Sequence, residues 1–124
     1  MSRLVLAAAI AMAACAQTDN DRPKTLPYIT EAILQPSCAQ DVCHSSFRMA
    51  KGYAFDTVEM TRRSLTPSAS SPSIVNPAEP ESSLLYTVLT RKIKRMPYDA
   101  PLPQKDIDLI LRWIQDGAPG LDLP

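Results

Sequence analysis

The sequence predicts a small all-α domain of three or four short helices joined by long loops. Apolar residues recur at helical spacing in three segments, around 28–35, 81–94 and 103–116. No segment shows the strict alternation of apolar and polar residues that is typical of a half-buried β-strand. Twelve prolines against three glycines favour rigid, extended connections between the helices.

The N-terminal segment predicts export. Residues 1–14 carry one basic residue, Arg3, before an apolar run that ends in small residues ahead of Cys15. The run is shorter than the roughly 20 residues that a membrane-spanning helix needs. The alternative is a buried helix of an alanine-rich core. The segment MAAC, ending at Cys15, resembles the lipobox of bacterial lipoproteins, and this resemblance implies cleavage before Cys15 and a lipid on its sulfur.

After cleavage the chain is predicted to consist of a tether and one domain. Residues 15–27 start with the lipidated cysteine and are polar and proline-containing, which favours a flexible tether. Residues 28–124 are predicted to form the domain. Its first helix is expected at 28–35, and Pro36 is expected to end it.

The middle of the domain is predicted to contain one short helix among loops. Gly52–Phe55 is expected as an extended segment, and Thr57–Arg63 as a short helix. Residues 64–81 contain four prolines, many serines and no periodicity, so they are expected to form a long loop.

The next predicted helix spans residues 81–94. Its apolar face consists of four aliphatic residues: Leu84, Leu85, Val88 and Leu89. A second proline-rich loop, 96–103, is expected to follow it.

The last helix has clear start and stop signals. Pro103 suits its first turn, and Gly117 is a natural end. Its buried face is predicted to be an aliphatic stripe with Trp113 at the edge. The stripe consists of Ile107, Ile110, Leu111 and Ile114.

Composition excludes several kinds of site. Basic and acidic residues, 13 of each, give no basic footprint for nucleic acid. A single histidine, His44, excludes blue-copper and Rieske centres and the two-histidine zinc sites of metalloproteases. Three cysteines cannot supply the four thiolates of an ordinary iron–sulfur cluster or all-cysteine zinc site. Because the predicted core is thin, a covalent staple or an embedded cofactor is expected to help stabilise it.

The segment Cys38–His44 (CAQDVCH) is the main candidate for chemistry. A cysteine pair that ends in Cys-His indicates covalent haem attachment when the spacing is C-x-x-C-H. Two thiols then add to the haem vinyl groups, and the imidazole lies under the iron. Here the spacing is C-x4-C-H. Five residues turn a helix by about 140° net, so Cys38 and Cys43 cannot face one haem from a regular helix, and residues 39–42 are expected to bulge.

Three other interpretations of this segment stay open from the spacing. Cys38 and Cys43 fit a small-loop disulfide of an exported protein. With His44 they also fit a zinc site that Asp41 or water completes. His44 by itself fits an ordinary structural histidine.

Further motifs accompany this segment in a fixed order. They are Pro36-Ser37-Cys38, Cys43-His44, 76–86 (NPAEPESSLLY), Arg95-Met96-Pro97 and 110–118 (ILRWIQDGA). The order resembles the compact c-type cytochrome domain of planctomycete and myxobacterial exported proteins. That domain has a Pro-Ser-Cys…Cys-His motif, a Pro-Gly-x-Pro…Ser-x-Leu turn and helix, a Met-Pro loop and a terminal Trp-Ile-x-x-Gly-Ala helix.

The resemblance spans residues 28–119 and departs from the family at two points. The x4 spacing replaces the commoner x2, and Ala78 stands where the family has glycine. The resemblance implies a small cytochrome-c-like fold whose loops wrap one covalent haem c. It also implies that Cys38 and Cys43 form the thioethers and that His44 is the proximal ligand.

The second axial ligand is predicted to be a methionine, because the chain has no second histidine. Met49 follows His44 by five residues, a reach of at most about 18 Å, which is too short to pass round the haem edge. Met60 has the reach but lies at a spacing typical of core residues. Met96 precedes Pro97 in a rigid loop and matches the Met-Pro element of the family, so Met96 is the predicted ligand.

The basic run Arg91–Arg95 (RKIKR) has two interpretations. It fits a solvated helix C-terminus that complements the helix dipole. It also fits a surface that docks acidic redox partners or pairs with the haem propionates. The expected walls of the haem pocket are the helix-stripe aliphatics and four aromatic residues, Tyr53, Phe55, Tyr98 and Trp113, and a place in the hydrophobic core is the alternative for each of them.

Together these features predict a lipid-anchored monohaem c-type cytochrome on the periplasmic side of the bacterial envelope, an electron carrier rather than an enzyme. Its expected partners are acidic redox proteins near Arg91–Arg95 and, through the lipid, the membrane. One alternative is a five-coordinate haem sensor or peroxidase-like protein. The other is a haem-free lipoprotein interaction module with a Cys38–Cys43 disulfide.

Overall fold

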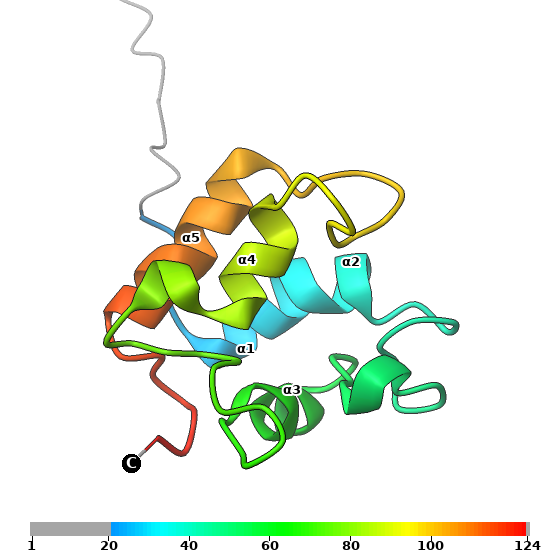
Figure 1. Ribbon diagram of the computed structural model, residues 1–124, viewed down its shortest axis with the longest axis horizontal. Helices are drawn as coiled ribbons and strands as arrows, with labels where there is room; N and C mark the ends of the chain where they lie inside the picture. The colour runs from blue at the N-terminus through cyan, green and yellow to red at the C-terminus, as the bar shows by residue number, and fades with distance from the viewer. Residues whose placement is uncertain (1–20, 124) are drawn as a thin grey trace, which may run out of the picture.

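The structure is a computed structural model that describes residues 21–123 (Figure 1). The predicted signal peptide, residues 1–14, and the predicted lipidation site Cys15 lie outside the described residues. Residues 21–123 contain helices, one isolated bridge between Ser68 and Ser71, and no strand. The prediction of a small all-α domain is confirmed. In this part of the chain no helix is long and apolar enough to span a bilayer.

Residues 21–123 contain five α-helices, joined by shorter helical turns and loops. They are α1 (Leu26–Ile29), α2 (Gln35–Cys38), α3 (Val58–Leu65), α4 (Leu84–Thr90) and α5 (Gln104–Gln115). A π-helical turn, Thr30–Leu34, joins α1 to α2, and 3-10 turns lie at Ala50–Gly52 and Pro80–Ser82. Helix α4 packs on α5, while α3 packs on α1 and the π-helical turn (Figure 1).

The first helical segment is longer than predicted, because Pro36 does not end it. It begins at Leu26 and continues to Cys38. In the π-helical turn the Gln35 N–H donates to the Thr30 carbonyl, five residues back. This wider turn accommodates the proline, which has no N–H to donate and would clash with the carbonyl four residues back in a regular α-helix.

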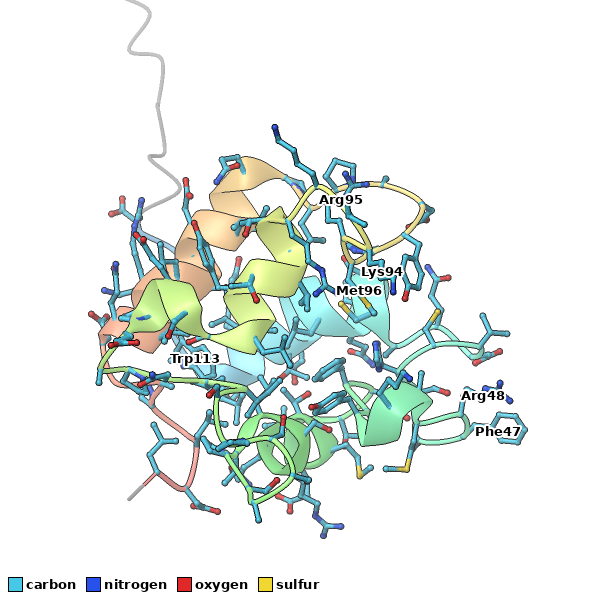
Figure 2. All side chains as sticks on the ribbon, viewed as in Figure 1. Phe47, Arg48, Lys94, Arg95, Met96 and Trp113 are labelled. Atoms are coloured by element: carbon cyan, nitrogen blue, oxygen red, sulfur yellow. The ribbon has the colours of Figure 1, made fainter. Side chains whose placement is uncertain are left out.

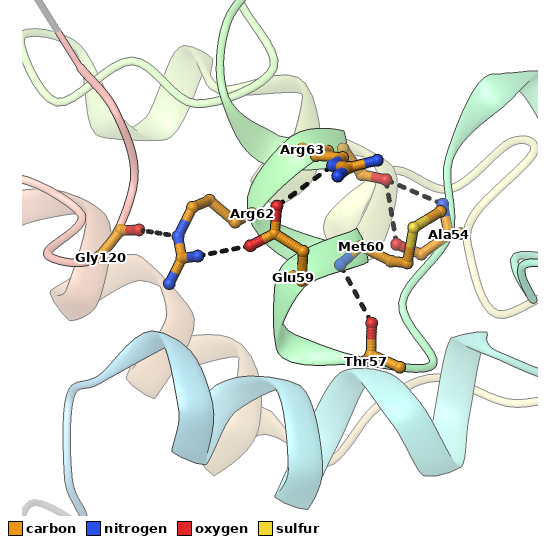
Figure 3. Close-up of polar contacts among 8 residues, drawn as sticks. Ala54, Thr57, Glu59, Met60, Arg62, Arg63 and Gly120 are labelled. Carbon is orange, nitrogen blue, oxygen red and sulfur yellow. Dashed lines mark hydrogen bonds and ion pairs between the residues drawn. The ribbon is translucent and has the colours of Figure 1, made fainter.

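Helix α3 confirms the predicted helix at 57–63 and holds the segment before it (Figure 3). The Thr57 side chain caps its first turn. The Ser64 hydroxyl accepts a hydrogen bond from the Ala54 N–H at 2.8 Å and donates to the Ala54 carbonyl at 3.0 Å. Both residues are buried, so these two bonds fix the extended segment 53–55 against the helix.

The outer face of α3 carries a small cluster of charges (Figure 3). Glu59 contacts Arg62 at 2.6 Å and Arg63 at 3.1 Å. The Arg62 Nε also donates to the Gly120 carbonyl at 2.9 Å. Exposed ion pairs contribute little stability, but the Arg62 bond joins α3 to the C-terminal turn.

Helix α4 is shorter than the predicted helix at 81–94. It ends where Arg91 adopts an extended conformation, with φ −67° and ψ 153°. In a longer helix the Val88 carbonyl would accept from residue 92, whereas here the Met96 N–H donates to it at 2.7 Å. The like charges of the run 91–95 would also repel one another on a helix surface. The run is therefore a loop that begins at the C-cap of α4, Arg91, and the prediction that the helix continues to residue 94 is wrong.

Helix α5 confirms the predicted last helix. Pro103 lies at its N-cap, and Gly117 follows its end with φ +93°. Trp113 is fully buried rather than at the edge of the stripe. Leu109 is also buried, whereas Leu111 is only half-buried. The buried face differs from a single stripe because both α4 and the turn before it cover α5.

The chain enters the domain along α5. Arg22 contacts Asp106 at 2.7 Å, and Lys24 contacts Asp116 at 2.5 Å. These ion pairs hold residues 22–24, which the sequence assigns to the tether, on the surface of the last helix.

Candidate functional site

Two neighbouring cavities lie between the loops 39–52 and 91–99. Their volumes are about 690 Å³ for the first and about 520 Å³ for the second, which is in the range of small-molecule and cofactor sites. The residues that line both cavities are Cys38, His44, Lys51, Met96 and Tyr98. Because these walls are shared, the two cavities adjoin each other, and together they are called the cleft below.

The two ends of the cleft differ in character. The first cavity has the more polar lining and alone includes Cys43, Arg48, Met49 and Asp99. The second cavity is mostly apolar. Its aliphatic walls come from the π-helical turn, the loop before α4, and α4 itself, and include Leu34, Ile74, Leu85 and Leu89.

His44 is held by the backbone of the segment 53–55. Its Nδ1 lies 3.3 Å from the Tyr53 carbonyl oxygen. A carbonyl only accepts hydrogen bonds, so Nδ1 carries the proton and Nε2 has the free lone pair that a metal ion binds. The Phe55 and Tyr53 rings lie against the imidazole, with centroids 5.3 Å and 6.2 Å away. The segment that Ser64 fixes therefore sets both the tautomer and the orientation of His44.

Backbone hydrogen bonds also fix the cysteine segment. The His44 N–H donates to the Cys38 carbonyl at 3.1 Å, and the Cys43 N–H donates to the Gln40 carbonyl at 2.8 Å. The Phe55 N–H donates to the His44 carbonyl at 2.8 Å. Residues 39–42 lie outside the helix, as the C-x4-C-H spacing leads one to expect.

Both thiols are free and line the cleft. Burial raises the pKa of the Cys38 thiol to about 12, and the nearby Cys43 makes a smaller contribution in the same direction. Among residues 21–123, no three His, Cys, Asp or Glu side chains gather into a group that could hold a metal ion. The zinc interpretation, with Asp41 or water as the fourth ligand, has no support in this geometry.

Met96 is the methionine that lines both cavities. Its hydrogen bond to Val88 attaches it to the end of α4, and Figure 2 shows it beside Lys94, near α2. Met49 lines only the first cavity, and Met60 lines neither. The structure therefore brings Met96 to the same part of the cleft as His44.

Three of the four expected aromatic walls line the cleft, namely Tyr53, Phe55 and Tyr98. Trp113 is not a wall of the cleft, because it lines neither cavity; it is fully buried in the core, which was the alternative for this residue. Figure 2 shows it well away from Met96. The aliphatic walls also come from other elements than the stripe of α5, and nothing but their hydrophobicity marks them in the sequence.

The border of the cleft is basic. Arg48 and Lys51 contribute from one loop, and Arg91 and Lys94 contribute from the other. The Arg91 Nε donates to the Lys94 carbonyl at 2.8 Å, which closes the second loop. Arg48 and Lys51 were not among the candidates from sequence, since isolated basic residues in a loop carry no signal of a shared site.

Large apolar side chains are exposed on the same two loops. Val42 is 78% exposed, Phe47 91% and Ile93 78%. Figure 2 shows Phe47 and Arg48 pointing outward from the fold. Exposed apolar residues within a basic border are typical of a surface that contacts another protein.

No family model, no curated protein and no solved structure matches this chain in a comparison with known proteins.

Proposed function

We propose that the protein is a monohaem c-type cytochrome that carries single electrons on the periplasmic side of the bacterial envelope, anchored by a lipid on Cys15. One observation carries the proposal. Cys38, Cys43, His44 and Met96 line the same cavity, although Met96 is distant from the others in the sequence. Two thiols, an imidazole and a thioether are the groups that hold a covalent haem with Met/His ligation.

The character of the cleft supports the fit of a haem. The hydrogen bond at Nδ1 of His44 leaves Nε2 as the ligating nitrogen. Both thiols are free for attachment. The second cavity offers apolar walls for a flat, apolar ring. When bound, a haem supplies an iron that alternates between the ferric and ferrous states.

The residues of the chain would hold this group and set its potential. Each of Cys38 and Cys43 would hold the haem by adding its S–H across a vinyl double bond, which forms a C–S and a C–H bond and needs no oxidant or reductant. His44 and Met96 would hold the iron from the cleft walls that they share. The aliphatic walls would limit the contact of a bound haem with water and so disfavour the extra charge of the ferric state, which together with a methionine ligand would favour a high potential.

The border of the cleft supports an acidic redox protein as partner. Four basic residues, Arg48, Lys51, Arg91 and Lys94, line the cleft against a single carboxylate, Asp99. Such a field attracts an acidic surface and speeds encounter. The exposed apolar residues of the two loops would make the short-lived direct contact that electron transfer needs.

Expression together with a c-type maturation system tests the proposal. The purified protein is expected to show a c-type α-band that survives acid-acetone extraction, with one haem per chain. The oxidised protein is expected to show a weak far-red band from the methionine ligand. Met96→Ala should abolish that band. Met49→Ala and Met60→Ala are the matched controls and should keep it.

Other outcomes separate the rival functions. A covalent haem without the far-red band, unchanged by Met96→Ala, would contradict the ligand assignment and favour the five-coordinate sensor or peroxidase-like protein. No haem after maturation, with Cys38 and Cys43 joined in a disulfide by mass spectrometry, would overturn the proposal and favour the interaction module. Cys15→Ser is expected to abolish incorporation of a labelled fatty acid, which tests the lipid anchor separately.

A further inference from the structure

The charged groups of the cleft are unevenly distributed between its two ends. Arg48 and the carboxylate Asp99 line only the first cavity. Arg91 and Lys94 line only the second, and Lys51 lines both. Among the described residues that line the second cavity, every charged one is therefore a cation, set in otherwise apolar walls. Such a pocket fits a ligand with an apolar body and an anionic edge.

The thiols are unevenly distributed as well. Cys43 lines only the first cavity, whereas Cys38 lies where the two cavities meet. The vinyl groups of a haem occupy one edge of the ring, and its two propionates occupy the opposite edge. Attachment at Cys38 and Cys43 would therefore favour an orientation with the vinyl edge at the Cys43 end of the cleft and the propionate edge at the second cavity.

We propose that Arg91 and Lys94 bind the haem propionates, an inference that rests on the proposed function and goes beyond it. The hydrogen bond from Arg91 Nε to the Lys94 carbonyl holds the two residues in one closed loop. This bond uses Nε, so the terminal guanidinium nitrogens are the ones that would meet a carboxylate. The run 91–95 then has a role inside the site, and partner docking falls mainly to the loop 39–52.

The chain offers matched variants for the test. Lys94→Gln removes a cation but keeps the carbonyl that Arg91 uses. Lys92→Gln removes the same charge from the same loop at a residue that lines neither cavity. Arg48→Gln removes a cation from the opposite end of the cleft. Arg91→Lys keeps the charge and changes only its geometry.

Two readouts are measured on the haem-loaded variants, the midpoint potential and the propionate bending bands in resonance Raman spectra. Lys94→Gln is expected to lower the potential at least twice as far as Lys92→Gln, because the nearby propionate charge is no longer neutralised. That difference should persist in high salt, which screens the distant charge of Lys92. The propionate bands should shift in Lys94→Gln and stay unchanged in Lys92→Gln and Arg48→Gln, with an intermediate shift in Arg91→Lys.

Each contrary outcome has a defined meaning. Equal effects of Lys94→Gln and Lys92→Gln, with unmoved propionate bands, would overturn the inference while the haem itself upholds the proposed function. A band shift in Arg48→Gln alone would place the propionates at the Cys43 end and would also overturn it. A wild-type protein that attaches no haem would overturn both this inference and the proposed function. Circular dichroism of each variant checks that the fold is retained.

Discussion

Ser64→Ala should show how far the fold depends on a single hydroxyl. The Ser64 side chain makes two hydrogen bonds to Ala54, at 2.8 Å to the N–H and 3.0 Å to the carbonyl. Both residues are buried, so water cannot easily replace the lost partner. The substitution leaves one backbone donor and one acceptor unsatisfied.

The expected loss of stability is several times that of an ordinary surface substitution. Two lost hydrogen bonds and the desolvation of the two orphaned groups together are expected to cost about 2–4 kcal/mol in the free energy of unfolding. Ser82→Ala is the matched control, since Ser82 makes one exposed hydrogen bond, to the Glu79 carbonyl at 2.8 Å. Its expected cost is within about 0.5 kcal/mol.

Urea unfolding followed by circular dichroism measures both variants, with the slope of each transition fitted independently. A loss below about 1 kcal/mol for Ser64→Ala, or equal losses in the two variants, would refute the reasoning. It would mean that the segment 53–55 keeps its place without the hydroxyl, and that the orientation of His44 has another source.

Three further predictions concern other parts of the fold. Gly120→Ala places a Cβ 2.8 Å from the Leu26 Cβ, at a φ of +99°. Gly52→Ala is the control, because its φ is also positive, +83°, but nothing lies within 4 Å of the added Cβ. Urea unfolding should show that Gly120→Ala lowers the free energy of unfolding by about 1–3 kcal/mol more than Gly52→Ala does. Folding raises the pKa of Cys38 to about 12 from its ordinary 9.0, so the thiol ionises more readily in the unfolded chain. The free energy of unfolding of the haem-free protein, measured in urea, should therefore fall as the pH rises between these values. Cys38→Ser should remove that decline. Trp113→Phe should lower the free energy of unfolding by about 1–3 kcal/mol in the same measurement. The smaller ring leaves a gap in the core, and the hydrogen bond of 3.1 Å from Trp113 to the Pro119 carbonyl is lost. No measurable loss would contradict a central role of Trp113 in the core.

Features with local signals could be predicted from the sequence. Pro103 and Gly117 mark the ends of α5 because each acts on the backbone beside it. The end of α4 could not be predicted in this way. It depends on the hydrogen bond from the Met96 N–H to the Val88 carbonyl. The sequence of the helix does not indicate where the following loop folds back onto it. Pro36 was misleading for a similar reason, since the π-helical turn before it removes the clash.

The candidate site likewise contains residues that a local sequence signal marks and residues that only the packing of the fold brings there. The segment Cys38–His44 is contiguous, so its spacing alone marks it as chemically important. Leu34 and Ile74 are ordinary aliphatic residues from separate elements, and only the packing of those elements makes them walls of the cleft. Trp113 carries the strongest aromatic signal of the last helix, yet its size suits the centre of the core, where it is fully buried.

The π-helical turn makes the length of the first helical segment as important as its composition. It contains one more residue than a regular α-helical path between α1 and α2 would need. Winding the same five residues as a regular α-helix would rotate everything beyond them by nearly one residue's turn, about 100°, about the helix axis. Cys38, the last residue of α2, would then turn from the cleft. Insertions in this segment are therefore expected to be far less tolerated than substitutions of its exposed residues, whereas deletion of one residue should restore a regular helix and keep Cys38 near the cleft.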